Sequence, residues 1–306
     1  MVEVPSALTA LQPATSSAYR RAADTVLPLA DPRLLTLCRE QLQATQQRRS
    51  WHPPADCTGA DRQALALAEQ FAVDVNGISE AQVAALGGAI GAEAVNVLVN
   101  SLYLVDMGLR LQQVAPVVLA GAGDAAPASA GQPAADAGSD SDAAVEEIVA
   151  GVIADFAAQA VLADAVDPLT SELVRLRCAQ VHHCRLCGSL RQRIALENGF
   201  EESMAERVAR YEQGGFSDAQ VAALHLVDTL ILTPADAGPA LKEELERHYS
   251  LEQIAELCFD VVKWSQQKAL VATHIDAPPW EGIRVLDFDG DGHPLFTGPV
   301  AGAAQR

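Results

Sequence analysis

The second half of the chain repeats the pattern of the first half, and this repeat limits the folds that the chain can adopt. An Asp-Pro pair follows an apolar helical segment at Asp31 and again, 136 residues later, at Asp167. Two later segments, 59–71 and 91–105, recur with an offset of 159 residues. The sequence therefore predicts two diverged copies of one domain, with about 23 extra residues in the second copy, just after its C-x-x-C motif.

The composition favours helices over sheets. Hydrophobic residues make up 49% of the 306 residues and aromatic residues only 5%, and alanine and leucine dominate. Alanine and leucine are strong helix formers, whereas strands are rich in β-branched and aromatic residues. We therefore predict an all-α protein built from two tandem helix bundles.

The formal net charge of −19 argues against binding to nucleic acids or to anionic membrane surfaces. The chain has no N-terminal signal pattern and no uninterrupted apolar run near twenty residues, so neither export nor membrane spanning is expected. The six cysteines are too scattered for a disulfide framework, which is typical of a reduced, intracellular chain. These features predict a cytoplasmic protein.

The pattern divides the chain into four parts. Residues 1–119 form the first helical domain, and residues 143–277 form the second. Between them, residues 120–142 hold small residues, Pro, Gly and Asp with no large apolar side chain, which predicts a flexible linker. In the tail, 278–306, two short apolar runs flank the turn-forming sequence D-F-D-G-D-G, which predicts a β-hairpin.

The second half contains a stretch that is rich in chemically active side chains. It holds one glutamate, two adjacent histidines, a C-x-x-C pair and an arginine: Glu172, His182, His183, Cys184, Cys187 and Arg191. When C-x-x-C opens a helix, the backbone N–H groups and the helix dipole favour a thiolate over a thiol. The pattern indicates reversible dithiol–disulfide exchange, with Glu172 and a histidine available to move protons.

Two other interpretations of the cysteine pair stay open at this stage. The two cysteines can be buried packing residues, or they can be half of a zinc site. A structural zinc site needs a second pair of ligands, and His182 and His183 lie too close to Cys184 in the sequence to supply it. Thiol redox chemistry is therefore the preferred interpretation.

The same stretch resembles the core motif of the carboxymuconolactone decarboxylase superfamily, in the branch of alkylhydroperoxidase D. That motif reads E-x(11)-C-x-x-C-x(3)-H before a long helical run. Glu172, Cys184 and Cys187 match it, and Arg191 stands where the family has histidine. The resemblance implies helical subunits that assemble into homo-oligomers, and here a tandem form with one redox centre per chain.

The resemblance also implies a reaction and the roles of the site residues. In such enzymes the second cysteine, here Cys187, attacks a hydroperoxide, and the first, Cys184, closes a disulfide that a thioredoxin- or lipoyl-type donor reduces. No cofactor is implied. Because arginine stays protonated, we expect Arg191, one helical turn after Cys187, to stabilise the thiolate. Proton transfer then falls to Glu172 or to His183.

The matched positions of the first copy lack this chemistry. An offset of 136 places Thr36, Arg48 and Trp51 opposite the glutamate and the two cysteines, which predicts a purely structural first domain. Three classes of function remain: a thiol-dependent peroxidase or disulfide reductase, a non-redox enzyme such as a lactone decarboxylase, and a pathway-specific or metal-binding protein that uses the cluster of histidines and cysteines. The peroxidase is the preferred class.

Overall fold

The computed structural model describes residues 2–122 and 144–300. Within them the protein is mostly helical and carries one small three-stranded sheet, which confirms the predicted helical class. Almost all of the predicted linker, 120–142, lies outside the described residues.

The helices of the first half begin at the residues that cap them. Asp31 accepts a hydrogen bond from the backbone N–H of Leu34, with Pro32 at the first helical position, and Thr58 and Asp61 form a capping box. The helices are α1 (Ser6–Leu11), α2 (Pro13–Val26), α3 (Pro32–Gln46), α4 (Gly59–Val73), α5 (Glu80–Ile90) and α6 (Ala92–Val118).

The second half uses the same devices. Asp167 accepts a hydrogen bond from the N–H of Thr170 and is followed by Pro168, as Asp31 is followed by Pro32. The helices are α7 (Val145–Val161), α8 (Pro168–Val181), α9 (Arg185–Gly188), α10 (Arg193–Glu197), α11 (Glu202–Arg207), α12 (Asp218–Leu232), α13 (Pro239–Glu246), α14 (Leu251–Trp264) and α15 (Gln267–Ala272).

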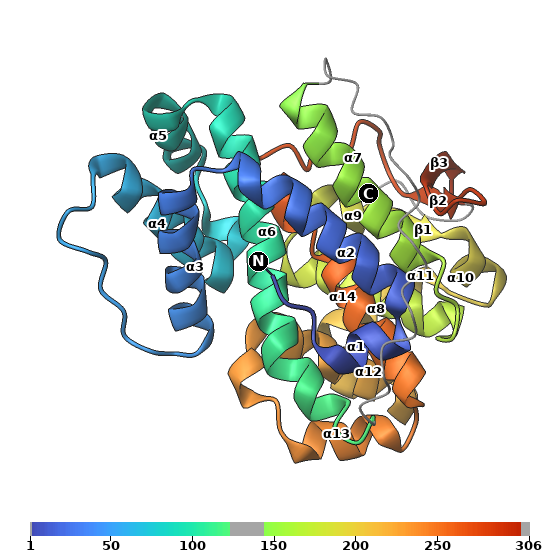
Figure 1. Cartoon of the computed structure of the whole chain (residues 1–306). Coiled ribbons are helices and arrows are strands. Elements are labelled where there is room, and N and C mark those ends of the chain that lie inside the picture. The colour runs from blue at the N-terminus through green and yellow to red at the C-terminus, as the bar shows by residue number, and fades with distance from the viewer. Residues whose placement is uncertain (1, 123–143, 301–306) are drawn as a thin grey trace.

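The long helix α6 lies in the middle of the protein and contacts helices of both halves (Figure 1). By length and composition it could cross a membrane, but 83% of its most apolar 18-residue window is buried inside the protein, as in a core helix. Helices α2 and α7, one from each half, also pack against each other. One continuous hydrophobic core therefore runs through both halves.

The sheet joins the C-terminal tail to the C-x-x-C segment. Strands β2 (Arg284–Phe288) and β3 (Pro294–Pro299) form the predicted antiparallel hairpin. Strand β1 (Leu190–Gln192) pairs in parallel with β2. Just before β1, the carbonyl of Ser189 accepts a hydrogen bond from the N–H of Arg284. The expected long helix after the second cysteine is therefore wrong, because the tail offers a strand edge that draws these residues into the sheet.

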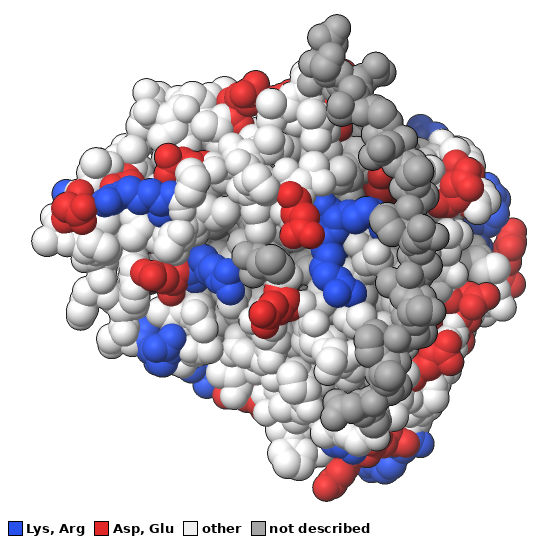
Figure 2. Space-filling model, viewed as in Figure 1, with Lys and Arg blue, Asp and Glu red and all other residues white. Residues whose placement is uncertain are grey.

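Acidic and basic side chains are interspersed on the face shown in Figure 2, where most of the remaining surface is uncharged. The basic side chains on that face form small separate groups rather than one broad basic area. The described surface pairs include Arg48 with Asp236 and Arg33 with Asp56.

Candidate functional site

The two motif cysteines lie at a sharp turn between α8 and α9. Two residues after the end of α8, His183 adopts a left-handed conformation with φ of 55°, and the N–H of Cys184 returns to the carbonyl of Ala179 at 2.9 Å. Cys184 then occupies the N-cap position of α9, as the motif predicts. The sulfurs of Cys184 and Cys187 are 2.8 Å apart, so the turn brings them together for disulfide formation.

The turn makes the two sulfurs chemically different. The pKa of Cys184 is lowered, first because its sulfur accepts a hydrogen bond from the Cys187 thiol, and also because it accepts one from the Cys187 backbone N–H at 3.3 Å. The pKa of Cys187 is raised well above its ordinary value, because its thiol donates to Cys184 and is partly buried. The charge of Arg175 lowers both pKa values, and that of Asp276 raises both. The reduced pair therefore favours a thiolate on Cys184.

The carboxylate of Glu172 is not free to act at the cysteine turn, because Arg175 binds it. Arg175 donates to both of its oxygens, at 2.7 and 2.6 Å, and both side chains are fully buried. The same guanidinium donates to the backbone carbonyls of Cys187, at 2.7 Å, and Leu190, at 2.5 Å. Glu172 and Arg175 together hold the backbone at Cys187 and Leu190 in place.

Arg191 does not face the sulfurs. It lies on β1, and its guanidinium binds the carboxylate of Glu202 at 2.5 and 3.0 Å and the carbonyls of Gly188 and Leu190 at 2.7 and 2.6 Å. The expected position one helical turn after Cys187 is wrong, because α9 ends at Gly188 and a strand follows. Arg175 is the residue whose positive charge lowers the pKa of both cysteines.

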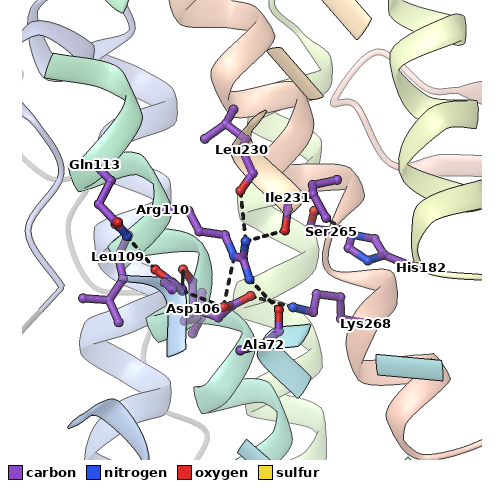
Figure 3. A network of polar contacts seen from close by, with 12 residues as sticks. Ala72, Asp106, Leu109, Arg110, Gln113, His182, Leu230, Ile231, Ser265 and Lys268 are labelled. Atoms are coloured by element: carbon purple, nitrogen blue, oxygen red, sulfur yellow. Dashed lines mark hydrogen bonds and ion pairs between the residues drawn. The ribbon is translucent and has the colours of Figure 1, made fainter. Parts of the chain in front are cut away.

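The two adjacent histidines point in different directions. The imidazole of His182 is buried, and its Nε2 lies 3.1 Å from the hydroxyl of Ser265 (Figure 3). Burial and the nearby charges of Lys268 and Arg110 hold the pKa of His182 well below its ordinary value. His182 is therefore an uncharged core residue.

A network of buried charges occupies the interior beside His182 (Figure 3). The carboxylate of Asp106 binds Arg110 at 3.0 Å and Lys268 at 2.6 Å. Burial lowers the pKa of Lys268 to about 8. Arg110 also donates to the carbonyls of Ala72 and Ile231, at the C-terminal ends of α4 and α12. The network thus ties helices of the two halves together.

His183 is exposed and lines the same cavity as Cys184. Histidine can accept or donate a proton near neutral pH, so His183 is the motif-region imidazole that can act on a molecule beside this sulfur. Among the described residues, no group of three or more His, Cys, Asp or Glu side chains is arranged to hold a metal ion. His182 is buried in the core and His183 is exposed, so the predicted alternative, a metal on this cluster, gains no support.

The C-terminal tail fixes the outer side of the cysteine turn. The carboxylate of Asp276 binds the backbone N–H and the guanidinium of Arg185, at 2.8 and 2.7 Å, and its carbonyl accepts from the N–H of Leu186 at 2.8 Å. The indole of Trp280 donates to the hydroxyl of Ser189 at 3.1 Å. The dithiol is therefore held between α8 and the tail.

A cavity of about 710 Å³ opens beside Cys184. Apolar side chains make up about half of its lining, and the remainder includes three arginines and His183. The lining residues are Leu176, Arg177, Ala179, Gln180, Val181, His183, Cys184, Arg185, Gly188, Arg191, Ala205, Ala209 and Leu232. Such a volume is typical of pockets that bind small organic molecules. Cys184, the buried cysteine with the lower pKa, thus lines a space where a substrate can lie.

Comparisons with known proteins find two relatives in Mycobacterium tuberculosis. They are uncharacterized protein MT2376 of strain CDC 1551 / Oshkosh and uncharacterized protein Rv2313c of strain ATCC 25618 / H37Rv. Each is 33% identical over 233 residues, which cover 75% of this chain and 78% of the relative. The chain belongs to their family. No family model and no solved structure matches the chain, and the names of the relatives carry no activity.

Two residues of the site, Arg175 and Asp276, are absent from the sequence-based predictions. Arg175 follows Glu172 by three residues on a helix, a spacing that favours an ion pair, and this signal could have been read. Asp276 lies 92 residues beyond Cys184, and no local pattern places it at the turn. Of the other cysteines, Cys38 and Cys258 have pKa values raised to about 12 by burial, as packing residues do.

Proposed function

We propose that the protein is a thiol-dependent peroxidase of the alkylhydroperoxidase D type, in which Cys184 and Cys187 alternate between dithiol and disulfide. The observation that carries this proposal is the cysteine pair itself. Its sulfurs lie 2.8 Å apart, the pKa of Cys184 is lowered, and Cys184 lines a cavity. A low-pKa thiol that lines a cavity and has a second thiol beside it is typical of peroxide-reducing sites.

The reaction has two steps. The Cys184 thiolate attacks the outer oxygen of a hydroperoxide ROOH, so that an S–O bond forms, the O–O bond breaks, and RO⁻ leaves and takes up a proton. The Cys187 thiol then attacks the resulting sulfenic acid, a disulfide forms, and water leaves. The family resemblance implies that Cys187 attacks the peroxide and Cys184 closes the disulfide. We propose the reverse roles, because the hydrogen bonds favour the thiolate on Cys184.

The other site residues act around this pair. Arg175 supplies the positive charge that favours the thiolate, and Glu172 is a positioning residue that holds Arg175 in place. His183 donates the proton that RO⁻ requires, because it lines the cavity with Cys184. Arg191 takes no part in proton transfer or in thiolate stabilisation, since its guanidinium is engaged by Glu202.

We also propose that the chain is a tandem of two copies of one helical domain, as in the carboxymuconolactone decarboxylase superfamily. Contacts between matched positions support it. Tyr103 donates to the carbonyl of Val262, which lies 159 residues later, at 3.1 Å. Arg110 binds the carbonyls of Ala72 and Ile231, again 159 residues apart. Equivalent positions meet in this way when two copies pack around an approximate two-fold axis.

The turns that follow α3 and α8 show which residues of the two copies correspond near the cysteines. The N–H of Arg49 returns to the carbonyl of Ala44 at 2.9 Å, as that of Cys184 returns to Ala179. Because α3 is one residue longer than α8, the turn places Arg49, and then His52, opposite the two cysteines. This replaces the sequence match to Arg48 and Trp51, and the first copy still offers no thiol at the matched positions. One redox centre per chain follows.

The natural reactants follow from the same proposal. A small-molecule hydroperoxide is the oxidant, and a dithiol of thioredoxin or lipoyl type is the reductant. We propose a cytoplasmic homo-oligomer with neither nucleic-acid nor membrane partners, in line with the net charge of −19. No cofactor enters the reaction.

A coupled assay tests the proposed function. The protein should consume hydroperoxide in the presence of reduced lipoamide or a reduced thioredoxin system, and both Cys184→Ser and Cys187→Ser should abolish turnover. Cys57→Ser is the matched control, because Cys57 is a buried cysteine of the first half and should leave turnover unchanged. Turnover that survives the loss of both motif cysteines would refute the proposal.

A further inference from the structure

The second half contains a segment that the first half lacks. Residues 47–58 join α3 to α4, whereas residues 182–217 join α8 to α12, which occupy the corresponding places in the helix order. The additional residues after β1 form α10, α11 and a short 3₁₀ helix, Val208–Gln213. We call residues 193–216 the inserted segment.

The inserted segment is firmly attached to α8. Phe200 and Val208 pack with Leu173 and Leu176 of α8 in a small hydrophobic cluster of their own. The Arg191 guanidinium holds the carboxylate of Glu202 at the start of α11. Such contacts fix the position of the segment relative to the cysteine turn.

This segment forms one wall of the cavity beside Cys184. Ala205 and Ala209 of the inserted segment line it, together with Leu176 and Ala179 of α8. Hydrogen peroxide needs little more room than a water molecule, whose share of liquid volume is about 30 Å³. The cavity of about 710 Å³ is much larger, so it has room for an organic group.

The charges of the cavity indicate what kind of group fits. Its three arginines, Arg177, Arg185 and Arg191, are each paired with a carboxylate, at 2.7, 2.7 and 2.5 Å. Paired guanidinium groups offer little net attraction to an anion. The lining therefore suits an uncharged organic group better than a carboxylate or phosphate.

We propose that the inserted segment selects, by size, the molecules that reach Cys184, and that Ala209 is the specificity-determining residue. The uncharged carbon group of an organic hydroperoxide lies against Ala209 while its outer oxygen meets the Cys184 sulfur. This inference rests on the proposed function and deepens it. Ala209 is exposed, so a larger side chain there fills the cavity without disturbing the core.

The test compares a bulky and a small oxidant. With Ala209→Trp, kcat/KM for cumene hydroperoxide should fall about tenfold or more, while kcat/KM for hydrogen peroxide should stay within about twofold of the original value. The matched control is Ala84→Trp, which places the same side chain on an exposed alanine of α5 and should change neither value. Equal losses with both oxidants would overturn the inference.

A second readout does not depend on peroxidase activity. In a Cys187→Ser background, Ala209→Trp should slow alkylation of Cys184 by N-phenylmaleimide but not by iodoacetamide. If the protein reduces no peroxide but this size selection holds, the proposed function fails and the role of the inserted segment stands. If peroxide is reduced but Ala209→Trp alters neither oxidant preference nor alkylation, only the role of the segment fails.

Discussion

Arg175 holds both carboxylate oxygens of Glu172, at 2.7 and 2.6 Å, one helical turn apart in a part of α8 that solvent does not reach. Removing one member of a buried ion pair leaves the other charge uncompensated. Glu172→Gln and Arg175→Met should therefore each lower the free energy of unfolding by about 3–5 kcal/mol, and the double variant should lose less than the sum. Urea unfolding measures all three, and additive losses would show that the pair is not coupled.

Arg175, and not Arg191, is the cation that we expect to act on the dithiol. In the double variant Glu172→Gln/Arg175→Met the pKa of Cys184 should rise, because a neighbouring positive charge is lost. Arg191→Met is the comparison, and it should leave this pKa unchanged, since Arg191 is engaged by Glu202. The pH dependence of Cys184 alkylation, followed by mass spectrometry of the peptide, measures both. A rise with Arg191→Met alone would restore the sequence-based expectation.

The thiol of Cys187 should control the acidity of Cys184. Cys187→Ala removes the side-chain donor to the Cys184 sulfur and should raise the pKa of Cys184. Cys187→Ser retains a hydroxyl donor and should raise it less. The same alkylation profile distinguishes the two variants. Identical profiles for alanine and serine would mean that the hydrogen bond between the side chains does not set the thiolate position.

Part of this site follows from the sequence and part does not. The capping turn at Cys184 and the hairpin after Ile283 rest on local patterns, so they could be predicted. The strand β1 could not, because it forms only when the tail supplies β2, more than 90 residues away. Because of the same long-range contact, Arg191 lies on a strand and binds Glu202, instead of lying on the expected helix face.

The roles of charged residues were the hardest to predict. Glu172 looked available for proton transfer because the motif shows its identity but not its buried partner Arg175. The sequence does not show that His182 is buried while its neighbour His183 is exposed, a difference that accompanies the left-handed conformation of His183. Direction and burial, rather than residue type, decide which of these groups can act.

Glu256 should make stability depend on pH. Its carboxylate accepts hydrogen bonds from the N–H groups of Ala165 and Val166, but burial, followed by the charge of Asp260, raises its pKa from 4.5 to about 7. The folded state therefore binds more protons than the unfolded state between these values. This group's contribution to the free energy of unfolding should fall as the pH rises from 4.5 to 7, by up to about 3 kcal/mol, and then stay constant.

Glu256→Gln isolates this contribution, because glutamine is close in shape and does not titrate. The free energy of unfolding of the unaltered protein should drop more between pH 5 and pH 7.5 than that of the variant, as measured by urea unfolding at both values. Parallel pH profiles for the two proteins would contradict a raised pKa of Glu256.

The central claim is that Cys184 and Cys187 form one peroxide-oxidised dithiol centre per chain. Its most direct test is a thiol count and intact mass after the reduced protein meets one equivalent of cumene hydroperoxide. We predict the loss of two thiols and about 2 Da per chain, with a disulfide between peptides holding Cys184 and Cys187, and a trappable sulfenic acid on Cys184 in Cys187→Ser. An unchanged thiol count, or oxidation confined to other cysteines, would contradict the account.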